Sequence, residues 1–147
     1  MDVILKKVNS SDLLPIRSKI LRNNASYNYC KYKGDNLDSS FHIGAYVNNK
    51  IIGGASLIKK KSTHKNLTNC YQIRGMCVLE DFQNKGIGKK ILKEAEKHCK
   101  ILKIQNIWLN ARVKAANFYL KLNYIDLGFR YEIKGIGLHY FLYKKLQ

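Results

Sequence analysis

The sequence lacks the residue spacings of a metal site and the apolar segments of a membrane or secreted protein. None of its four cysteines forms a Cys-x-x-Cys pair, and no cluster of histidines accompanies them, so a zinc site is not expected. No apolar run approaches the length of a membrane span, and the first residues do not have the layout of a signal peptide. We therefore predict a cytoplasmic protein with reduced thiols, no metal ion and no membrane partner.

Acidic residues are scarce. The 147 residues include 27 lysines and arginines but 10 aspartates and glutamates, which gives a formal net charge of +17. Such a charge suits a polyanionic partner, for example nucleic acid or a nucleotide cofactor. However, 22 of the 27 basic residues are lysines scattered along the chain. We attribute most of the charge to compositional bias on solvated faces, and we expect one domain, residues 1–147.

The most informative segment is the turn Gln83–Gly88, which reads Gln-Asn-Lys-Gly-Ile-Gly. It follows an apolar strand-like run, Ile73–Leu79, and opens an amphipathic helical stretch, Lys85–Lys103. The apolar face of this helix is predicted to consist of Ile87, Ile91, Leu92, Ala95, Cys99 and Leu102. A turn of this kind leaves backbone N–H groups unpaired, and the helix dipole adds partial positive charge there. Because Gly86 and Gly88 carry no Cβ, a ligand can approach the backbone. The segment predicts a seat for a phosphate or pyrophosphate group.

Two common nucleotide-binding patterns are absent at this turn. A P-loop requires a glycine where Gln83 stands and a serine or threonine where Lys90 stands. A dinucleotide fingerprint requires a third glycine at the position of Ile91 and an acidic residue at the position of Asn110. The turn therefore binds a phosphate ligand of another kind, or it is a helix start without a ligand.

The hydrophobic pattern predicts the element order β-α-β-β-β-α-β-α-β-β. This order is not the regular alternation of a doubly wound fold, and it favours a mixed sheet. The predicted strands are Val3–Val8, Phe41–Val47, Ile51–Lys59, Tyr71–Leu79, Ile104–Asn110, Tyr124–Ile133 and Leu138–Lys144. Asn48-Asn49-Lys50, between the second and third of these strands, predicts a hairpin. The predicted helices are Leu13–Leu21, capped within Ser10–Asp12, then Lys85–Lys103 and Val113–Leu122; Asn23–Ser40 is expected to be an irregular loop.

Two segments resemble motifs of the GNAT N-acetyltransferase superfamily. Gln-x-x-Gly-x-Gly at Gln83–Gly88 is similar to the family's acetyl-CoA-binding motif. Ala115–Tyr124 looks like its Ala-x-x-Phe-Tyr-x-Lys-x-Gly-Phe helix, with Asn123 in the place of the glycine. Further segments resemble an uncharacterised branch of the family: Phe41–Ala45, Arg74–Met76, Asn110–Val113 and Ile133–His139.

The resemblance implies an α/β (α+β) fold of the GNAT type. Its sheet would be central, mixed and mostly antiparallel, flanked by helices, with the two middle strands splayed apart near Val78 and Asn110. The implied activity is acetyl-CoA-dependent N-acetyltransfer to a primary amine of a small molecule, peptide or protein, directly in a ternary complex. A homodimer is compatible with this assignment.

The resemblance also implies the site residues. Tyr119 matches the tyrosine that protonates the departing thiolate, a role that suits a phenol because it remains protonated at neutral pH. Glu80, just past the splayed strand, is the first choice for the base, ahead of Asp81, Glu132 and His139. The backbone N–H of Val78 would polarise the thioester carbonyl. The expected cofactor-binding residues are Met76, Cys77, Val78, Gln83, Asn84, Lys85, Gly86, Ile87, Gly88, Lys89, Asn110 and Tyr119.

Other polar residues are expected to be structural. Asp35 and Asp38 could attract an amine, but acids beside a glycine usually form turns. A small thiol such as that of Cys77 in an apolar strand is more often buried than nucleophilic. Lone histidines are more often packed or hydrogen-bonded than catalytic, and this applies to His42, His98 and His139.

Two other functions stay open. The first is a basic nucleic-acid-binding module, in which Tyr27, Tyr29 and Tyr32 would stack bases. Nothing in the sequence resembles an RNA-binding motif, so nucleic acid is not an expected partner. The second is an acyl-CoA-binding sensor that has lost turnover.

Overall fold

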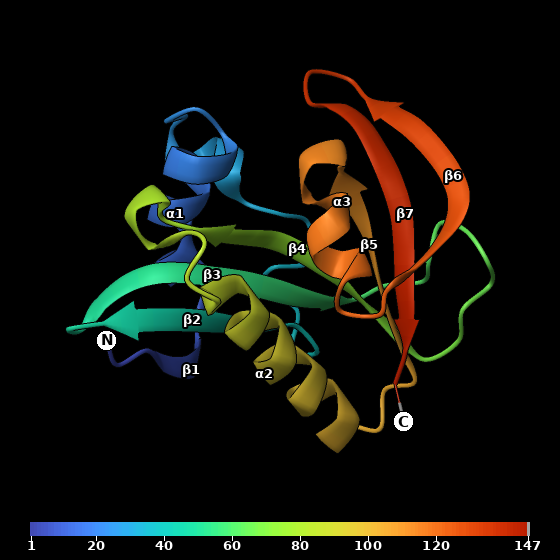
Figure 1. The fold of residues 1–147 in the computed structure, drawn as a ribbon, viewed down its shortest axis with the longest axis horizontal. Helices are drawn as coiled ribbons and strands as arrows, with labels where there is room; N and C mark the ends of the chain where they lie inside the picture. The colour runs from blue at the N-terminus through green and yellow to red at the C-terminus, as the bar shows by residue number, and fades with distance from the viewer. Residues whose placement is uncertain (147) are drawn as a thin grey trace. The chain divides into compact units, whose positions relative to one another are not determined.

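The computed structural model describes residues 1–146 as a mixed α/β fold (Figure 1). The strands are β1 (Ile4–Val8), β2 (Phe41–Val47), β3 (Lys50–Lys59), β4 (Cys70–Val78), β5 (Asn106–Arg112), β6 (Ile125–Ile133) and β7 (Gly137–Lys145). The helical segments are η1 (Ser10–Leu13), α1 (Leu14–Ile16), η2 (Arg17–Leu21), η3 (Tyr27–Cys30), η4 (Glu80–Phe82), α2 (Ile87–Ile101) and α3 (Val113–Leu120).

The strands follow the hydrogen-bonded order β1-β2-β3-β4-β5-β7-β6. The pairs β1–β2, β2–β3, β5–β7 and β6–β7 are antiparallel, and β4–β5 is parallel. This confirms the prediction of a mixed, mostly antiparallel sheet flanked by helices. The chain divides into two compact units, residues 1–59 with 73–98 and residues 60–72 with 99 onward. Strand β4 and helix α2 each have residues in both units. The prediction of a single domain stays a prediction.

The predicted hairpin in the first unit is confirmed. β2 and β3 pair antiparallel from Phe41 with Leu57 to Val47 with Lys50, with a register shift after Ala45. The two turn residues, Asn48 and Asn49, have φ of 49° and 63°. Left-handed conformations at both central positions suit the right-handed twist of the flanking strands, and asparagine adopts them more readily than most residues.

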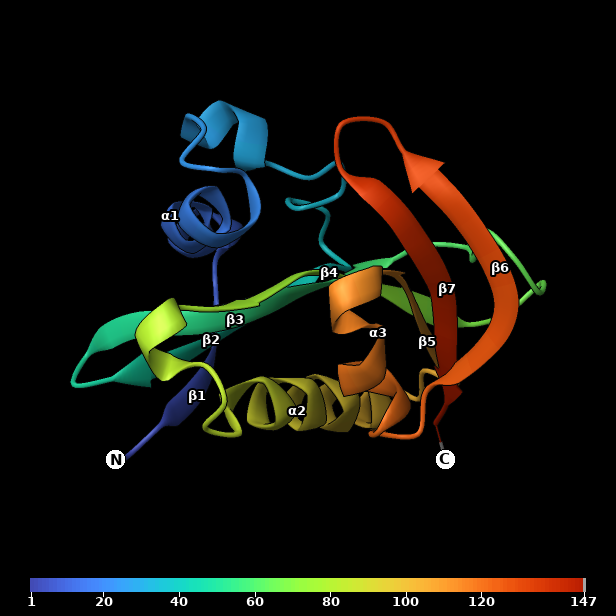
Figure 2. The same cartoon turned by 45° about the horizontal axis from the view of Figure 1, so that its top comes forward.

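Two consecutive glycines in β3 show how helices pack on both faces of the first unit. A Cβ added at Gly53 would lie 3.1 Å from Cδ1 of Ile91 in α2, whereas one added at Gly54 would lie 2.5 Å from Cδ2 of Leu13 in η1. Successive strand residues face opposite sides. Helix α2 therefore covers one face and the η1–α1 segment covers the other, as Figure 2 shows. Glycine at both positions lets the two helical layers approach the strand backbone.

The first helical segment differs from the prediction. It begins at Ser10 rather than at Leu13, because the Asn9 N–H donates to Asp12 Oδ2 at 3.2 Å and Asn9 acts as the N-cap, so the first turn starts three residues earlier. Pro15 lies in the first turn of α1, as expected. The segment then widens into the π-helical turn η2. The predicted irregular loop Asn23–Ser40 also contains a short 3-10 helix, η3.

Helix α2 buries most of the face that its sequence predicts. Its apolar positions are buried: Ile87, Ile91, Leu92, Ala95 and Cys99. Leu102, predicted on the same face, is 49% exposed, so that part of the prediction is wrong. Lys103 has φ of 60°, and the N–H of Ile104 returns to the carbonyl of Cys99 at 2.9 Å. This Schellman-type ending turns the chain away before Leu102 can join the buried face.

The second unit is built on β5, which pairs antiparallel with β7 along its full length from Asn106 to Arg112. The parallel ladder of β4 with β5 consists of Cys70–Gln72 opposite Asn106–Trp108. Helix α3 packs against β5 and β7, and β6 with β7 forms the long curved hairpin of Figure 1. The predicted splay of the middle strands near Val78 and Asn110 stays a prediction.

Aromatic packing dominates the interior of the second unit. A buried cluster joins Trp108, Phe141 and Tyr143 with Leu67 and Cys70. The Trp108 and Phe141 ring centroids are 5.9 Å apart, and Trp108 Nε1 donates to the Lys60 carbonyl at 2.9 Å. Buried indole rings usually need such a partner for their N–H. In residues 1–146, no helix has the length and apolar character needed to cross a membrane.

Candidate functional site

The predicted anion seat takes the form of an open turn at the start of α2. Gly86 has φ of 79°, and a Cβ added there would meet no atom within 4 Å. Lys90 donates its N–H to the Gly86 carbonyl at 3.2 Å. The amides of Ile87, Gly88 and Lys89 precede that first helical bond and have no carbonyl of the helix to bind. Together with the positive end of the helix dipole, they form a seat suited to a phosphate group.

Gln83 holds this turn against the end of β4. Its side-chain Nε2 donates to the Val78 carbonyl at 2.9 Å, and its backbone N–H donates to the Glu80 carbonyl at 3.2 Å. Asn84, with φ of 60°, then reverses the chain toward Gly86. Both the side-chain amide and the backbone N–H of Gln83 are therefore already hydrogen-bonded. The N–H groups available to an anion are those of Gly88 and its neighbours in the first helical turn.

The end of β4 carries the predicted pantetheine-binding stretch, Met76–Val78. Cys77 is buried, and burial raises the pKa of its thiol to about 12. The thiol is therefore neutral at physiological pH and is a poor nucleophile. Glu80 follows in η4 and is exposed to solvent. The structure thus places the glycine turn, this stretch and Glu80 in one unit, and the role of Glu80 as a base stays a prediction.

The second unit holds the other two predicted site residues. Tyr119, in α3, is 3% exposed, and its ring packs edge-on against Phe118 and Tyr124 with centroid distances of 4.9 and 5.5 Å. Asn110 Oδ1, on β5, is buried and has no hydrogen-bond partner within residues 1–146. A buried carbonyl oxygen without a donor is costly, and an amide N–H of a bound ligand would satisfy it. Asn123 has φ of 73°, as its place after the helix predicts.

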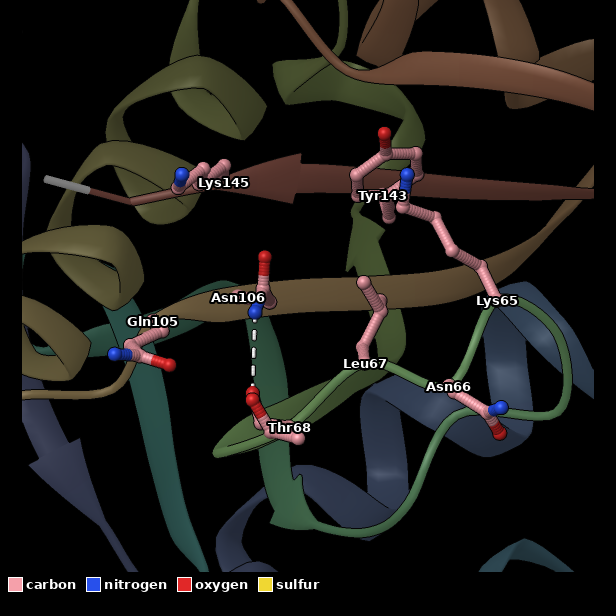
Figure 3. A pocket seen from close by; sticks show the side chains of 8 residues that line it. All are labelled: Lys65, Asn66, Leu67, Thr68, Gln105, Asn106, Tyr143 and Lys145. Carbon is pink, nitrogen blue, oxygen red and sulfur yellow. Dashed lines mark hydrogen bonds between the residues drawn. The ribbon is translucent and has the colours of Figure 1, made fainter.

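A pocket of about 560 Å³ also lies in the second unit (Figure 3). Its lining includes Leu67, Asn106 and Tyr143, and Asn106 Nδ2 donates to the Thr68 carbonyl at 3.1 Å. Lys65 reaches over the Tyr143 ring, with its Nζ 4.8 Å from the centroid. The predicted site residues do not line this pocket, so it belongs to another part of the surface.

Sequence reasoning missed a buried ionic network in the first unit. Arg17 is fully buried and holds Asp35 in a bidentate pair, with N–O distances of 2.7 and 3.0 Å. It also donates to the Cys30 carbonyl at 3.0 Å and to Ser56 Oγ at 2.6 Å. The signal was Arg17 itself, which occupies the apolar face of its helix four residues after Leu13.

Asp35 lies in a turn, as expected, because its N–H donates to the Tyr32 carbonyl at 3.1 Å, but its side chain is buried. Burial alone would raise its pKa, but the Arg17 guanidinium and the Tyr32 N–H hold the pKa below its ordinary value. Both carboxylate oxygens bind Arg17, and Oδ2 also accepts the Tyr32 N–H at 2.9 Å. The carboxylate therefore has a structural role, as expected, and Arg17 neutralises its charge.

The network continues to His42, which is hydrogen-bonded as expected. Its Nε2 lies 2.9 Å from the Asp35 carbonyl and its Nδ1 lies 2.6 Å from Ser56 Oγ. A carbonyl only accepts, so Nε2 carries the proton and Nδ1 accepts from the Ser56 hydroxyl. Burial lowers the pKa of His42, in agreement with a neutral ring. His98 binds Glu94 and His139 binds the Gly137 carbonyl, so these two also have structural partners.

Comparison with known proteins assigns the family. Residues 12–124 match the family model described as "Acetyltransferase (GNAT) family". The chain belongs to the GNAT acetyltransferase family. This GNAT chain is 34% identical over 143 residues to the "Uncharacterized N-acetyltransferase YitI" of Bacillus subtilis (strain 168), covering 97% of this chain and 96% of that protein.

Solved structures of low identity share the fold of this GNAT chain. Escherichia coli ElaA superposes with a TM-score of 0.78 at 18% identity, over 97% of this chain and 99% of ElaA. An aminoglycoside 6'-N-acetyltransferase complexed with coenzyme A superposes with a TM-score of 0.76 at 12% identity, over 97% and 96% of the two chains. The predictions of a GNAT fold and of an acetyltransferase enzyme are confirmed.

Proposed function

We propose that this enzyme transfers the acetyl group of acetyl-CoA directly to a primary amine of a small molecule, peptide or protein. The observation that carries the proposal is the open glycine turn at Gly86, with the amides of Ile87–Lys89 behind it. In a GNAT acetyltransferase, a seat of this kind suits the pyrophosphate of the cosubstrate. Acetyl-CoA supplies an activated thioester, and the chain's residues bind it, orient it and move protons.

Three groups of residues would hold the cosubstrate. The amides of Gly86–Lys89 and the side chains of Lys85 and Lys89 would bind its phosphates. The backbone of Met76–Val78 would pair with pantetheine as an added strand. The unsatisfied Oδ1 of Asn110 would accept a pantetheine amide N–H. The phosphate oxygens require donors, which the backbone N–H groups and lysines supply. The pantetheine amides require both donors and acceptors, which the strand backbone and Asn110 Oδ1 supply.

The transfer needs one base and one acid. The amine nitrogen, with its proton taken by Glu80 directly or through water, attacks the thioester carbon, and the N–H of Val78 stabilises the developing oxyanion. The carbon–sulfur bond then breaks, and Tyr119 gives its phenolic proton to the thiolate. Direct transfer is favoured over an acetyl-cysteine intermediate, because burial raises the pKa of the Cys77 thiol to about 12.

Replacing Tyr119 by phenylalanine tests this assignment. Loss of the proton donor should lower kcat by at least about 10²-fold, while the dissociation constant for acetyl-CoA stays within about twofold. Release of CoA reports kcat, and calorimetric titration reports the dissociation constant. Tyr124→Phe is the matched control, because it removes a second hydroxyl from the same aromatic group. An unchanged kcat, with pre-steady-state data showing that chemistry limits the rate, would remove Tyr119 from the mechanism.

A further inference from the structure

Three arginines surround one tyrosine in the first unit. The guanidinium carbon of Arg17 lies 4.0 Å from the centroid of the Tyr32 ring, that of Arg74 lies 4.1 Å away and that of Arg22 lies 5.7 Å away. These arginines come from helix η2, from its C-terminal end and from strand β4. We call Arg17, Arg22, Tyr32 and Arg74 the arginine–tyrosine cluster. Guanidinium groups stack on aromatic rings, but three on one ring repel one another.

The cluster has more positive charge than its surroundings neutralise. Both oxygens of Asp35 are committed to Arg17, so the three arginines and this one carboxylate leave a formal charge of +2. Arg22 donates to the Leu21 carbonyl at 3.0 Å. Within residues 1–146, no oxygen atom accepts a hydrogen bond from the Arg74 guanidinium. A half-buried cation without a hydrogen-bonded anion is unfavourable, and a bound anion would relieve it.

The backbone of β4 is shaped to bring Arg74 against the tyrosine. Gly75 has φ of 66°, and a Cβ added there would lie 2.9 Å from Cε2 of Tyr32 and 3.2 Å from Nε of Arg17. In a regular strand, neighbouring residues face opposite sides. Here Arg74 and the vacant side of Gly75 both meet Tyr32, because Gly75 adopts a left-handed conformation. The backbone at Gly75 therefore brings Arg74 close to the same ring that Arg17 contacts.

Burial and like charges both act on Arg74. Burial lowers the pKa of its guanidinium below the ordinary value, and Arg22 and Arg17 lower it further, while Tyr32 and Asp35 act in the opposite direction. The Nε of Arg17 is itself buried and lacks an acceptor within residues 1–146. The guanidinium groups of Arg74 and Arg17 are thus positioned close together without an anion for every N–H, and a bound anion would stabilise them.

We propose that the arginine–tyrosine cluster binds a carboxylate of the acceptor, so that the amine substrates of this enzyme are amino-acid-like molecules. The planar fork of a guanidinium matches the two oxygens of a carboxylate and gives bidentate hydrogen bonds. Arg74 supplies the fork, Arg22 supplies a second positive charge, and Tyr32 with Arg17 keeps both in position. This inference rests on the proposed function, and it assigns the class of acceptor that the function leaves open.

The position of Arg74 along β4 favours the acceptor over the cosubstrate. It precedes the stretch Met76–Val78, which the proposed function gives to pantetheine, whereas the phosphate seat at Gly86 follows that stretch. At about 3.3 Å per residue, Arg74 lies roughly 13 Å along the strand from Val78, whose N–H the proposed function gives to the thioester carbonyl. The extended Arg74 side chain and an amino-acid-like acceptor together would span this separation.

The test is a panel of acceptors that differ in one charged group. Each of several L-amino acids is compared with its C-terminal amide, and β-alanine is compared with ethanolamine and with 2-aminoethyl phosphate. We expect kcat/KM for the carboxylates to exceed that for the amides by about 10²-fold, because the amide leaves the cluster without its anion. Equal rates for acid and amide, or a preference of 2-aminoethyl phosphate over β-alanine, would overturn the carboxylate assignment.

Variants locate the discrimination in the cluster. Arg74→Gln should lower kcat/KM for the preferred amino acid by about 10²-fold, mainly through KM, and should leave the dissociation constant for acetyl-CoA within about twofold. Lys33→Gln is the matched control, because it removes one positive charge from an exposed position next to Tyr32 in the same loop. If Arg74→Gln retains the preference for acids over amides, the inference is wrong. If Arg74→Gln shows no cooperative melting, Arg22→Gln answers the same question through a fall of about tenfold.

The outcome separates this inference from the proposed function. Acetylation of neutral or cationic amines with no preference for acids would overturn the inference and leave the proposed function intact. Failure of acetyl-CoA to bind, measured by calorimetric titration, together with no acetylation of any amine, would overturn both.

Discussion

The interiors of the two units are stabilised by different interactions. In the first unit, the side chains of Arg17, Asp35, Ser56 and His42 form a continuous chain of buried hydrogen bonds. In the second unit, the cluster around Trp108 is aromatic, and its indole donates to a backbone carbonyl. Packed aromatic surface stabilises with little dependence on pH, whereas a buried ion pair requires that both partners keep their charge.

We relate this difference to the acceptor binding proposed for the first unit. Buried ion pairs contribute little net stability relative to well-packed apolar side chains, so stability alone does not explain the network around Arg17. The same arginine stacks on Tyr32 beside Arg74, in the cluster to which we assign acceptor binding. On that proposal, the buried charge of the first unit positions a binding group, whereas the second unit has the aromatic packing that favours stability.

Removing Asp35 should have the largest effect on stability. Asp35→Ala leaves the Arg17 guanidinium buried and unpaired, and we expect the free energy of unfolding to fall by about 3–5 kcal/mol. Urea denaturation of the purified protein measures the change. The double variant Arg17→Met with Asp35→Leu is the control, because it removes both charges and should recover most of the loss. A loss below about 1 kcal/mol in Asp35→Ala would show that the first unit does not depend on this pair.

A smaller loss is expected in the aromatic interior. Trp108→Phe removes part of a fully buried ring and the hydrogen bond from Nε1 to the Lys60 carbonyl. The free energy of unfolding should fall by about 2 kcal/mol, from the cavity and the lost donor together. The loss should be equal at pH 5 and pH 8, because no ionisable group is removed. A loss that differs between the two pH values would contradict the contrast between the two interiors.

The sequence predicts the features that are determined by residues close together along the chain. The hairpin follows from Asn48-Asn49, and the open turn at Gly86 follows from local glycine and helix-start patterns. The mixed, mostly antiparallel sheet flanked by helices follows from the family resemblance rather than from any single segment. The errors are also local: the helix after Asn9 starts one turn early, and α2 ends before Leu102.

The ionic network lies beyond such reasoning because its partners are far apart in the sequence. The hydrogen bonds of Arg17 reach Asp35, 18 residues away, and Ser56, 39 residues away. A loop acid beside a glycine gives no local sign that an arginine on a helix will bury it. The role of Tyr119 rests on the motif it matches, and that of Glu80 rests on its place just past β4. The experiment on Tyr119 decides the first of these roles.

Titration of His42 should give the smallest and most specific signal. Burial lowers the pKa of this ring in the folded protein, whereas in the unfolded chain it titrates near 6.5. The unfolded chain therefore binds the proton first as pH falls, and the free energy of unfolding should decrease below about pH 6.5. The slope for one proton is at most about 1.4 kcal/mol per pH unit. The Asp35 carboxyl, whose pKa is also held low, acts in the same direction but only below about pH 4.

Substituting His42 separates this contribution from every other titration. His42→Gln keeps a side chain able to hydrogen-bond Ser56, and it removes the proton that the unfolded chain would bind. Urea denaturation at several pH values between 5 and 7 should show a decline in the wild type and a nearly flat profile in the variant. A decline that persists in His42→Gln would place the titrating group elsewhere. The first interior would then owe its sensitivity to pH to a residue outside the chain of hydrogen bonds that begins at Arg17.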